Sequence, residues 1–280
     1  MKKVFKEADI PEELAYLPLI ESGFVNFARS NKGATGMWQF MPGTAKWMGM
    51  KMDSFIDERK DPIIACKFAA KFLNFLYEKL GDWHLVLAAY NHGGRNIINE
   101  LKKTKTNYFY DLVKAKTTPK ETRDYVPRFV ASVMIIKDLE KYSFSSIDES
   151  SDYEYYKFPF SAPAFVIAKR SNLKVEEFLR LNPALRDGYV PDPKYNYFVR
   201  LPKKNLDILL ENYEELKKDA SLCYVPYYIK QGDTLSEIAL RYGISTAFLL
   251  KINRVTNANR LFPGQKIYIP LRGYQLAKKK

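Results

Sequence analysis

Cysteine and histidine are both scarce in this 280-residue chain, which has two of each. The cysteines, Cys66 and Cys223, are too few for a disulfide framework or a cysteine-rich zinc site. The histidines, His84 and His92, exclude most multi-histidine metal sites, and no HExxH or paired CxxC motif is present. The sequence therefore predicts neither a metal site nor a cofactor. Cys66 lies in an apolar helical stretch and is expected to be a buried apolar residue.

Long apolar runs are missing as well. The longest, residues 85–90, has six residues, whereas a membrane-spanning helix needs about 20. We therefore expect no transmembrane segment in this chain. The basic start, Met1-Lys2-Lys3, is not followed by the apolar stretch of an export signal, because charged residues stand at positions 6, 7 and 9.

Positive charge, by contrast, is abundant. The chain has 45 Lys and Arg against 32 Asp and Glu, a formal net charge of +13. Residues 221–280 hold ten of these basic residues and two acidic ones. Such a surface attracts polyanions, namely nucleic acid, anionic lipid or an acidic cell-wall polymer. No helix-turn-helix, RNP or zinc signature supports nucleic acid, so we expect no nucleic-acid partner.

Apolar periodicity divides the chain. Residues 1–142 show a period near 3.6 in three stretches and are predicted to form one helical domain. The last helix of this domain is expected to open near Thr122, with Pro127 in its tolerated first turn. Residues 143–160 lose the periodicity and are rich in Ser, Asp, Glu and Tyr, so they indicate a linker or edge segment. An ordered loop packed on the first domain is the alternative.

A weak repeat follows the linker. Residues 172–182 align with residues 243–253, and each stretch precedes a short strand that ends in proline. The second copy adds a preceding strand and a helix opened by Thr234 and Glu237, which form a capping box. The predicted fold class is therefore α+β, a mainly α domain followed by small βααβ modules at residues 161–203 and 223–272. Residues 204–222 are expected to form a connecting helix and residues 273–280 a basic tail.

The segment PEELAYLPLIESG, residues 11–23, carries the most chemical information. Pro11 and the acidic residues after it mark a helix start. Helical spacing then places Glu21 on the same face as Leu14 and Leu17. A buried carboxyl group has a raised pKa, as a general acid requires. Pro18, inside this predicted helix, costs about 3 kcal/mol. The alternative is that Glu21 ends the helix and faces water or pairs with an arginine.

Three further segments carry residues suited to a cleft. In GATGMWQFMPGT, Gln39 is the lone amide among Met37, Trp38, Phe40 and Met41, a combination that suits a sugar. Ordinary core packing, with Gln39 bonded to backbone, is the alternative. The other two segments are AAYNHGG, which reads as a helix end facing a cleft, and ETRDYV, which opens the last helix.

In this order, ESGF, GxxGxWQFMPGTA, AYNHG and ETRDYV resemble the successive motifs of lytic murein transglycosylases of the lysozyme-like superfamily. The GMWQFMP variant resembles the membrane-bound transglycosylase D branch. Residues 224–270 resemble a LysM module, a type that binds glycans containing N-acetylglucosamine (GlcNAc). Residues 161–203 resemble a degenerate LysM copy without the GDTL signature. The resemblance implies a lysozyme-like catalytic domain in a peptidoglycan-cleaving enzyme, with peptidoglycan glycan strands as its partner.

The resemblance also implies roles for individual residues. Glu21 would protonate the glycosidic oxygen between N-acetylmuramic acid (MurNAc) and GlcNAc, then deprotonate the muramoyl C6 hydroxyl, which attacks C1 and gives a 1,6-anhydro product. The runner-up carboxylate is Glu121, and His92 departs from the small residue of many relatives. The expected substrate-binding residues are Ser22, Gln39, Tyr90, Asn91 and Tyr125. The expected glycan-binding residues of the LysM module are Gly232, Asp233, Thr234, Leu235, Leu261, Phe262 and Pro263.

Two alternatives stay open. A muramidase of the goose-type lysozyme kind shares the catalytic glutamate but uses water, and the fourth motif and the WQF sequence favour the transglycosylase. The second alternative is a wall-binding protein without catalytic activity. Such a protein would be expected to lack the catalytic glutamate, and Glu21 is present. Because peptidoglycan lies outside the cytoplasmic membrane, we expect the periplasm or cell envelope. The missing export signal then implies a truncated or mature chain.

Overall fold

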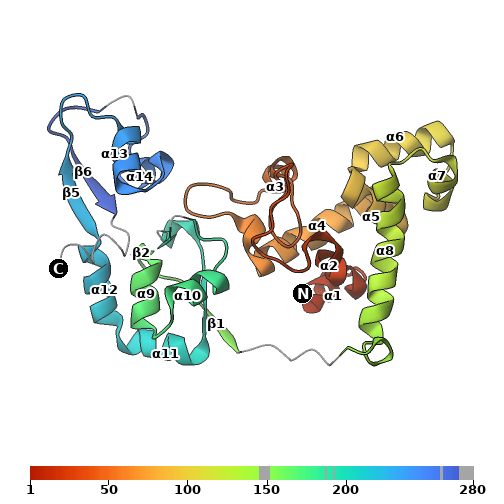
Figure 1. The fold of residues 1–280 in the computed structure, drawn as a ribbon, viewed down its shortest axis with the longest axis horizontal. Helices are drawn as coiled ribbons and strands as arrows, with labels where there is room; N and C mark the ends of the chain where they lie inside the picture. Colours follow the sequence, from red (N-terminus) through yellow and green to blue (C-terminus); the bar gives the residue numbers. More distant parts are fainter. Residues whose placement is uncertain (145–151, 187, 192, 259–260, 271–280) are drawn as a thin grey trace. The chain divides into compact units, whose positions relative to one another are not determined.

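The computed structural model describes residues 1–144, 152–186, 188–191, 193–258 and 261–270. The chain forms two units (Figure 1). The first comprises Met1–Met50 and Glu58–Asp148, and the second comprises Lys51–Asp57 and Glu149–Lys280. The basic tail predicted over residues 273–280 lies outside the described residues.

The first unit is helical. Its α-helices are α1 (Lys2–Glu7), α2 (Leu17–Ser22), α3 (Pro42–Met48), α4 (Pro62–Leu80), α5 (Trp83–His92), α6 (Gly94–Thr104), α7 (Phe109–Ala115) and α8 (Lys120–Lys137). Short 3₁₀ turns span Glu12–Tyr16, Glu58–Lys60 and Glu140–Tyr142. Helix α5 packs against α4, α6, α7 and α8. Its residues 85–89 are all buried, as expected of a helix that is apolar on every side.

Local sequence signals set the ends of the central helices. The Asp61 carboxylate caps α4 by accepting hydrogen bonds from the backbone N–H groups of Ile63 and Ile64, at 3.0 and 2.9 Å. Gly81 ends α4 in the left-handed conformation, with φ +67°. The next residue, Asp82, caps α5 through the backbone N–H of Leu85 at 2.9 Å. Two adjacent residues therefore close one helix and open the next.

Two helix starts differ from the prediction. The predicted helix after Pro11 is a 3₁₀ turn followed by α2, so Pro18 lies in the first turn of α2 rather than in a helix interior. In that position its missing N–H removes no helical hydrogen bond. Helix α8 begins at Lys120, with Pro119 as its N-cap, so Pro127 lies inside the helix. The expectation that Pro127 occupies the first turn is wrong.

The second unit contains two βααβ modules. The later one comprises β5 (Tyr224–Tyr228), α13 (Leu235–Tyr242), α14 (Thr246–Ile252) and β6 (Lys266–Pro270). The earlier one comprises β1 (Tyr153–Tyr156), α9 (Ala164–Arg170), α10 (Val175–Leu181) and β4 (Val199–Pro202). In each module the first strand pairs antiparallel with the last. The predicted fold class, mainly helical with small βααβ modules, is confirmed.

The earlier module also contains features that the sequence did not indicate. Strand β1 falls inside the predicted linker, residues 143–160, of which residues 145–151 lie outside the described part. A second strand pair joins β2 (Ala162–Pro163) to β3 (Tyr189–Val190), and a 3₁₀ turn spans Pro193–Tyr195. The predicted connecting helix is two helices, α11 (Lys203–Glu211) and α12 (Tyr213–Leu222). They meet at Asn212, whose side chain donates to the Ile208 carbonyl at 2.8 Å.

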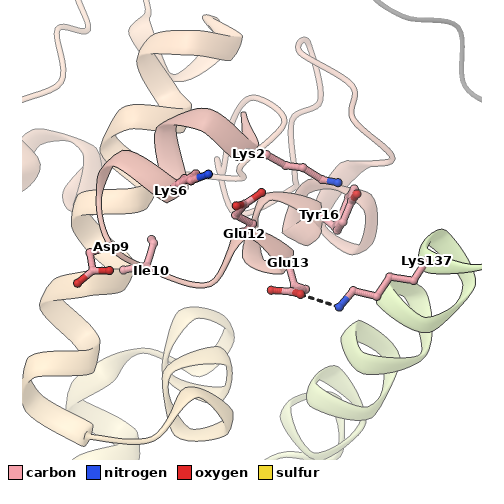
Figure 2. A pocket seen from close by; sticks show the side chains of 8 residues that line it. All are labelled: Lys2, Lys6, Asp9, Ile10, Glu12, Glu13, Tyr16 and Lys137. Carbon is pink, nitrogen blue, oxygen red and sulfur yellow. Dashed lines mark hydrogen bonds and ion pairs between the residues drawn. The ribbon is translucent and has the colours of Figure 1, made fainter.

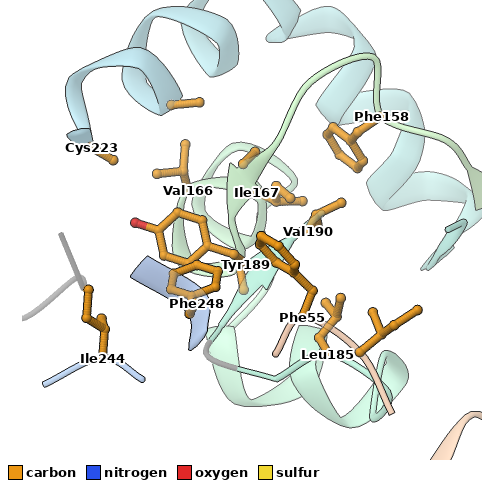
Figure 3. Close-up of a cluster of buried hydrophobic side chains, with 14 of the residues drawn as sticks. Phe55, Phe158, Val166, Ile167, Leu185, Tyr189, Val190, Cys223, Ile244 and Phe248 are labelled. Carbon is orange, nitrogen blue, oxygen red and sulfur yellow. The ribbon is translucent and has the colours of Figure 1, made fainter. Parts of the chain in front are cut away.

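One hydrophobic cluster contains residues of both modules (Figure 3). Segment Lys51–Asp57 contributes Phe55, whose ring centroid lies 5.2 Å from Tyr195 and 4.9 Å from Phe248. Backbone hydrogen bonds on either side of Ile56 pair this segment with residues 184–186, at 2.8 and 2.7 Å. The segment therefore completes the core of the second unit, although it interrupts the sequence of the first.

Neither cysteine forms a disulfide, and the two lie in different units. Cys66 and Cys223 are both free and buried, and burial raises the pKa of each thiol to about 11. In the described part of the chain, no helix combines the length and the apolar character needed to cross a membrane.

Candidate active site

Glu21 lies near the end of α2, which Gly23 terminates with φ +61°. Its Oε1 accepts a hydrogen bond from the Tyr125 hydroxyl of α8. Burial raises the pKa of Glu21 to about 7. The hydrogen bond from Tyr125 opposes this rise, and the negative charge of Glu121 adds to it. The carboxyl group is therefore divided between its protonated and ionised forms near neutral pH.

Burial, together with the negative charge of this carboxyl group, raises the pKa of two nearby tyrosines. Burial and the negative charge of Glu21 raise the pKa of Tyr125 well above its ordinary value, and the same two causes act on Tyr90. Both hydroxyls therefore stay protonated and act as donors. The Tyr90 hydroxyl donates to the Trp38 carbonyl at 2.7 Å, which joins α5 to the loop of the second motif.

Ser22 and Gln39 hold the loop of the second motif. The Ser22 hydroxyl donates to the Met37 carbonyl at 2.9 Å, so the residue after Glu21 fastens α2 to this loop. Gln39 has φ +48°, and its Nε2 donates to the Gly36 carbonyl at 2.7 Å and to that of Ala28 at 3.4 Å. The backbone-bonded alternative for Gln39 is thus the arrangement that the structure adopts.

The aromatic pocket predicted around Gln39 is mostly core. Met37, Trp38 and Phe40 are buried, and only Met41 among the four is exposed, at 42%. Trp38 stacks on Phe5 with ring centroids 5.7 Å apart. Burial of these large apolar side chains stabilises the conformation of the loop. The expectation that all four form walls around a bound sugar is wrong for the three buried residues.

The third and fourth motifs meet through Asn91. Its Oδ1 accepts a hydrogen bond from the Thr122 hydroxyl at 2.9 Å, which links the end of α5 to the start of α8. The Oδ1 of Asn91 is thus engaged within the protein. His92 pairs instead with Glu100, with 3.3 Å between Nε2 and Oε1. Glu121, the runner-up carboxylate, lies exposed on α8.

Two further residues, Arg59 and Gly36, hold this arrangement together. The Arg59 guanidinium donates to the carbonyls of Gly33 and Phe40 at 3.2 and 3.3 Å, and no motif signals it. The Arg59 carbonyl lies so close to Gly36 that a Cβ there would sit 1.8 Å from the oxygen. Gly36 also has φ +84°. The motif therefore needs glycine for both reasons.

The predicted glycan-binding residues of the LysM module come from two adjacent segments. In the first, Asp233 accepts from the Tyr227 hydroxyl and the Lys230 N–H, both at 2.8 Å. Thr234 caps α13 through the Glu237 N–H at 3.2 Å. Gly232 has φ +86°, and Leu235 is buried.

The second segment contains Leu261, Phe262 and Pro263, of which Phe262 is 68% exposed. The loop that follows is held to Ile229, just after β5, by two backbone hydrogen bonds. The Ile229 carbonyl accepts from the Gly264 N–H at 2.8 Å, and the Ile229 N–H donates to the Gln265 carbonyl at 2.9 Å. This brings the second segment beside the turn of the first. A flat apolar ring next to a rigid backbone turn is a surface suited to a sugar.

A polar cavity of about 500 Å³ lies near the start of the chain, between the first residues and α8 (Figure 2). Lys137 of α8 forms an ion pair with Glu13 across it at 2.6 Å. None of the predicted site residues lines it. Among the described residues, no cluster of three or more His, Cys, Asp or Glu side chains is arranged to hold a metal.

Family comparisons describe both units. Residues 2–113 match the transglycosylase SLT domain. Residues 227–270 match the LysM domain, and residues 166–218 match the LysM-like domain of lytic transglycosylase MltD. The resemblance to lytic transglycosylases with LysM modules is thus confirmed, although the SLT match ends before the fourth motif.

The chain is also similar to individual proteins. The chain is 29% identical over 283 aligned residues to membrane-bound lytic murein transglycosylase D of Escherichia coli K12, covering 94% of this chain and 61% of that protein. It is 43% identical over 75 residues to peptidoglycan transglycosylase gp16 of phage T7, covering 26% of this chain and 6% of that protein. The solved lytic transglycosylase Slt of Pseudomonas aeruginosa aligns with a TM-score of 0.42 and 25% identity, covering 52% of this chain and 24% of that one. The chain spans about three fifths of the length of the first relative.

Proposed function

We propose that this chain, which joins an SLT domain to LysM-type modules, is a lytic transglycosylase that cleaves peptidoglycan without water. The bond cut is the β-1,4 linkage from MurNAc to GlcNAc, and the product ends in 1,6-anhydro-MurNAc. The observation that carries the proposal is Glu21, whose pKa of about 7 suits both halves of such a reaction. The match of residues 2–113 to the SLT domain supports it.

The reaction proceeds in two proton transfers. Protonated Glu21 donates its proton to the glycosidic oxygen as the C1–O bond breaks. The resulting carboxylate then accepts the proton of the muramoyl C6 hydroxyl, whose oxygen forms a bond to C1. The net result is two chains, one ending in 1,6-anhydro-MurNAc and the other in GlcNAc with a free C4 hydroxyl, and no water is consumed. A group with a pKa near the working pH serves well as acid and then as base.

Ordinary glycosidases use two carboxylates. In this proposal a group of the substrate takes the role of the second one. Glu121 is the acidic residue whose charge acts on Glu21, but its exposure on α8 leaves it in water. The N-acetyl group of the substrate would stabilise the positive charge that develops at C1. Asn91, whose Oδ1 is bonded to Thr122, would donate a hydrogen bond from its amide NH₂ to the carbonyl of that N-acetyl group.

The other site residues act as positioning groups. Tyr125 orients the Glu21 carboxyl group and moderates its pKa. Ser22 holds α2 on the second motif, while Tyr90 ties α5 to the same loop. Gln39 shapes the loop, because its Nε2 donates to two backbone carbonyls. Its side-chain carbonyl oxygen would accept a hydrogen bond from the sugar.

The second unit is proposed to hold the enzyme on its substrate. The turn containing Gly232, Asp233, Thr234 and Leu235 and the segment Leu261, Phe262 and Pro263 would bind GlcNAc-containing strands. The positive net charge adds long-range attraction to an acidic wall polymer. This substrate places the enzyme in the cell envelope. Catalysis is assigned to the predicted helical domain, residues 1–142.

The test is digestion of purified peptidoglycan with the wild-type chain and with Glu21→Gln, followed by mass spectrometry. We expect anhydromuramoyl products, lighter by one water than hydrolysis products, from the wild type alone. Reducing muramoyl ends would identify a muramidase instead. Binding to peptidoglycan without any cleavage would leave a wall-binding protein. Anhydro products from Glu21→Gln would remove Glu21 from its proposed role.

A further inference from the structure

A second cavity, of about 580 Å³, lies in the second unit and takes no part in the function proposed above. Its volume falls within the range of about 300–1,000 Å³ that is usual for ligand sites. None of the predicted glycan-binding residues of the LysM module lines it. It is therefore a separate candidate site on the same unit.

Aromatic rings form much of its wall. They come from four parts of the unit: Phe55 from the segment before Glu58, Tyr195 from the 3₁₀ turn, Tyr224 from β5 and Tyr268 from β6. Tyr268 is 47% exposed, and the Lys266 Nζ lies 4.9 Å from the centroid of its ring. Aromatic rings offer flat apolar faces and, in tyrosine, a hydroxyl group at the edge. A pyranose ring, with C–H groups on its faces and hydroxyls around its rim, matches such a wall.

The charged side chains that line the cavity are basic. Lys194, Lys251 and Arg254 line the cavity, and no Asp or Glu does so among the described residues that form it. Lys251 is fixed in place, with its Nζ 2.8 Å from the Asp53 carboxylate and 4.5 Å from the centroid of the Tyr195 ring. Arg254 and Lys194 are exposed on the rim. Because Asp53 balances the charge of Lys251, the positive charge that favours an anionic ligand comes from Arg254 and Lys194.

We propose that this cavity binds the carboxylate-bearing units of peptidoglycan, the MurNAc residues substituted with a peptide stem. The aromatic wall would take the sugar ring, and Lys194 and Arg254 would pair with stem carboxylates. A neutral GlcNAc oligomer has no group for these cations. The inference rests on the proposed function for its choice of glycan. It gives the second unit two sites, one for the GlcNAc backbone and one for the stem-bearing sugar.

The experiment measures binding to the full chain carrying Glu21→Gln, so that the ligand is not cleaved. The probes are a soluble GlcNAc–MurNAc-peptide with free carboxylates and the same molecule with its carboxylates amidated. Calorimetric titration is expected to show at least tenfold tighter binding of the acidic probe. Adding Lys194→Gln and Arg254→Gln is expected to remove this difference. Both residues are exposed, and a thermal melt checks that the fold is retained.

A matched control uses the LysM module. Phe262→Ala is expected to weaken binding of a neutral GlcNAc oligomer while it leaves the preference for the acidic probe unchanged. An acid-over-amide preference that survives the double variant overturns the proposal, as does equal binding of the two probes by the parent chain. The digestion assay fails or succeeds separately, because it reads anhydro products from the chain with Glu21 intact.

Discussion

Asn182 and Asn253 make the same three hydrogen bonds in the two modules of the second unit. Each amide donates to the carbonyl four residues earlier in its helix, at 2.9 Å in both cases. Each also exchanges two hydrogen bonds with one residue of the closing strand. Asn182 does so with Arg200, at 2.9 and 2.7 Å, and Asn253 with Tyr268, at 2.8 and 2.6 Å. The weak repeat in the sequence therefore reflects one shared way of fixing the second helix to the last strand.

Loss of this amide should destabilise the earlier module. We expect Asn182→Ala to lower the free energy of unfolding by about 2–3 kcal/mol, because the half-buried backbone N–H and C=O of Arg200 in β4 lose their partners. Urea denaturation measures the change. Asn205→Ala, which removes a side-chain bond to the Ser171 carbonyl, is the control and should cost about 1 kcal/mol. Equal effects of the two substitutions would contradict the role assigned to Asn182.

The raised pKa of Glu21 makes stability depend on pH. The pKa is about 7 in the folded chain against an ordinary value of 4.5. The folded state therefore holds this proton more tightly, and the associated stability is complete below pH 4.5 and lost as pH rises to 7. The loss approaches about 3 kcal/mol. Glu21→Gln, which never ionises, should be the more stable chain at pH 8 and should differ little from wild type at pH 4.5.

Urea denaturation at both pH values checks this expectation. The carboxyl group of Glu21, proposed here as catalytic, is then a case in which function lowers stability. A stability difference between Glu21→Gln and wild type that stays constant from pH 4.5 to pH 8 would falsify the raised pKa.

Two neighbours of Glu21 should move the pH profile in opposite directions. Tyr125→Phe removes a hydrogen bond that favours the carboxylate, so the pKa of Glu21 rises, by on the order of one unit. Glu121→Gln removes a negative charge, so that pKa falls. The alkaline limb of kcat/KM, which reports the acid of the free enzyme, should therefore shift up in the first variant and down in the second. Shifts of the same sign in both variants would rule out this account of the site.

The effect of Glu121 should also depend on salt. Because Glu121 is exposed, its influence on Glu21 is screened at high ionic strength. The shift in Glu121→Gln should shrink between 0.05 and about 1 M salt. The shift in Tyr125→Phe should persist, because a direct hydrogen bond between partly buried groups is little screened.

Gly36 and Gly43 offer a matched pair in one motif. Gly36→Ala places a Cβ against the Arg59 carbonyl at a φ of +84°. We expect several kcal/mol of destabilisation or a displaced loop, with loss of activity. Gly43→Ala meets nothing within 4 Å and lies in α3, so it should be neutral or stabilise by about 0.5 kcal/mol. Thermal melts and the peptidoglycan assay compare the two. An unaffected Gly36→Ala would show that the Arg59 contact is not required.

Sequence patterns predicted the elements that depend on local signals. Thr234 caps a helix where the sequence placed a capping box, because capping involves residues a few positions apart. The patterns failed where distant residues decide. Trp38 faces the core because Phe5 stacks on it, and no spacing within the second motif reveals that contact. Arg59 was missed for the same reason, since it holds the loop by bonding two carbonyl groups far from it in sequence.

The candidate site shows the same division. Helical spacing placed Glu21 on an apolar face, but the bond from Tyr125 and the charge of Glu121 come from α8 and were suggested only by the order of the motifs. Gln39 and Asn91 were named from those motifs without their partners. Their hydrogen bonds to Gly36 and Thr122 decide which side-chain atoms are left for a ligand.

Segment Lys51–Asp57 has a consequence for how this architecture is inherited and dissected. A fragment that starts after residue 152 carries both βααβ modules but lacks Phe55, so the ring faces of Tyr195 and Phe248 that it covers would meet water. Recombinant versions of the second unit would need these seven residues supplied in trans or grafted. The second unit is therefore not encoded by one continuous stretch of sequence, and a boundary drawn along the chain alone would omit part of its core.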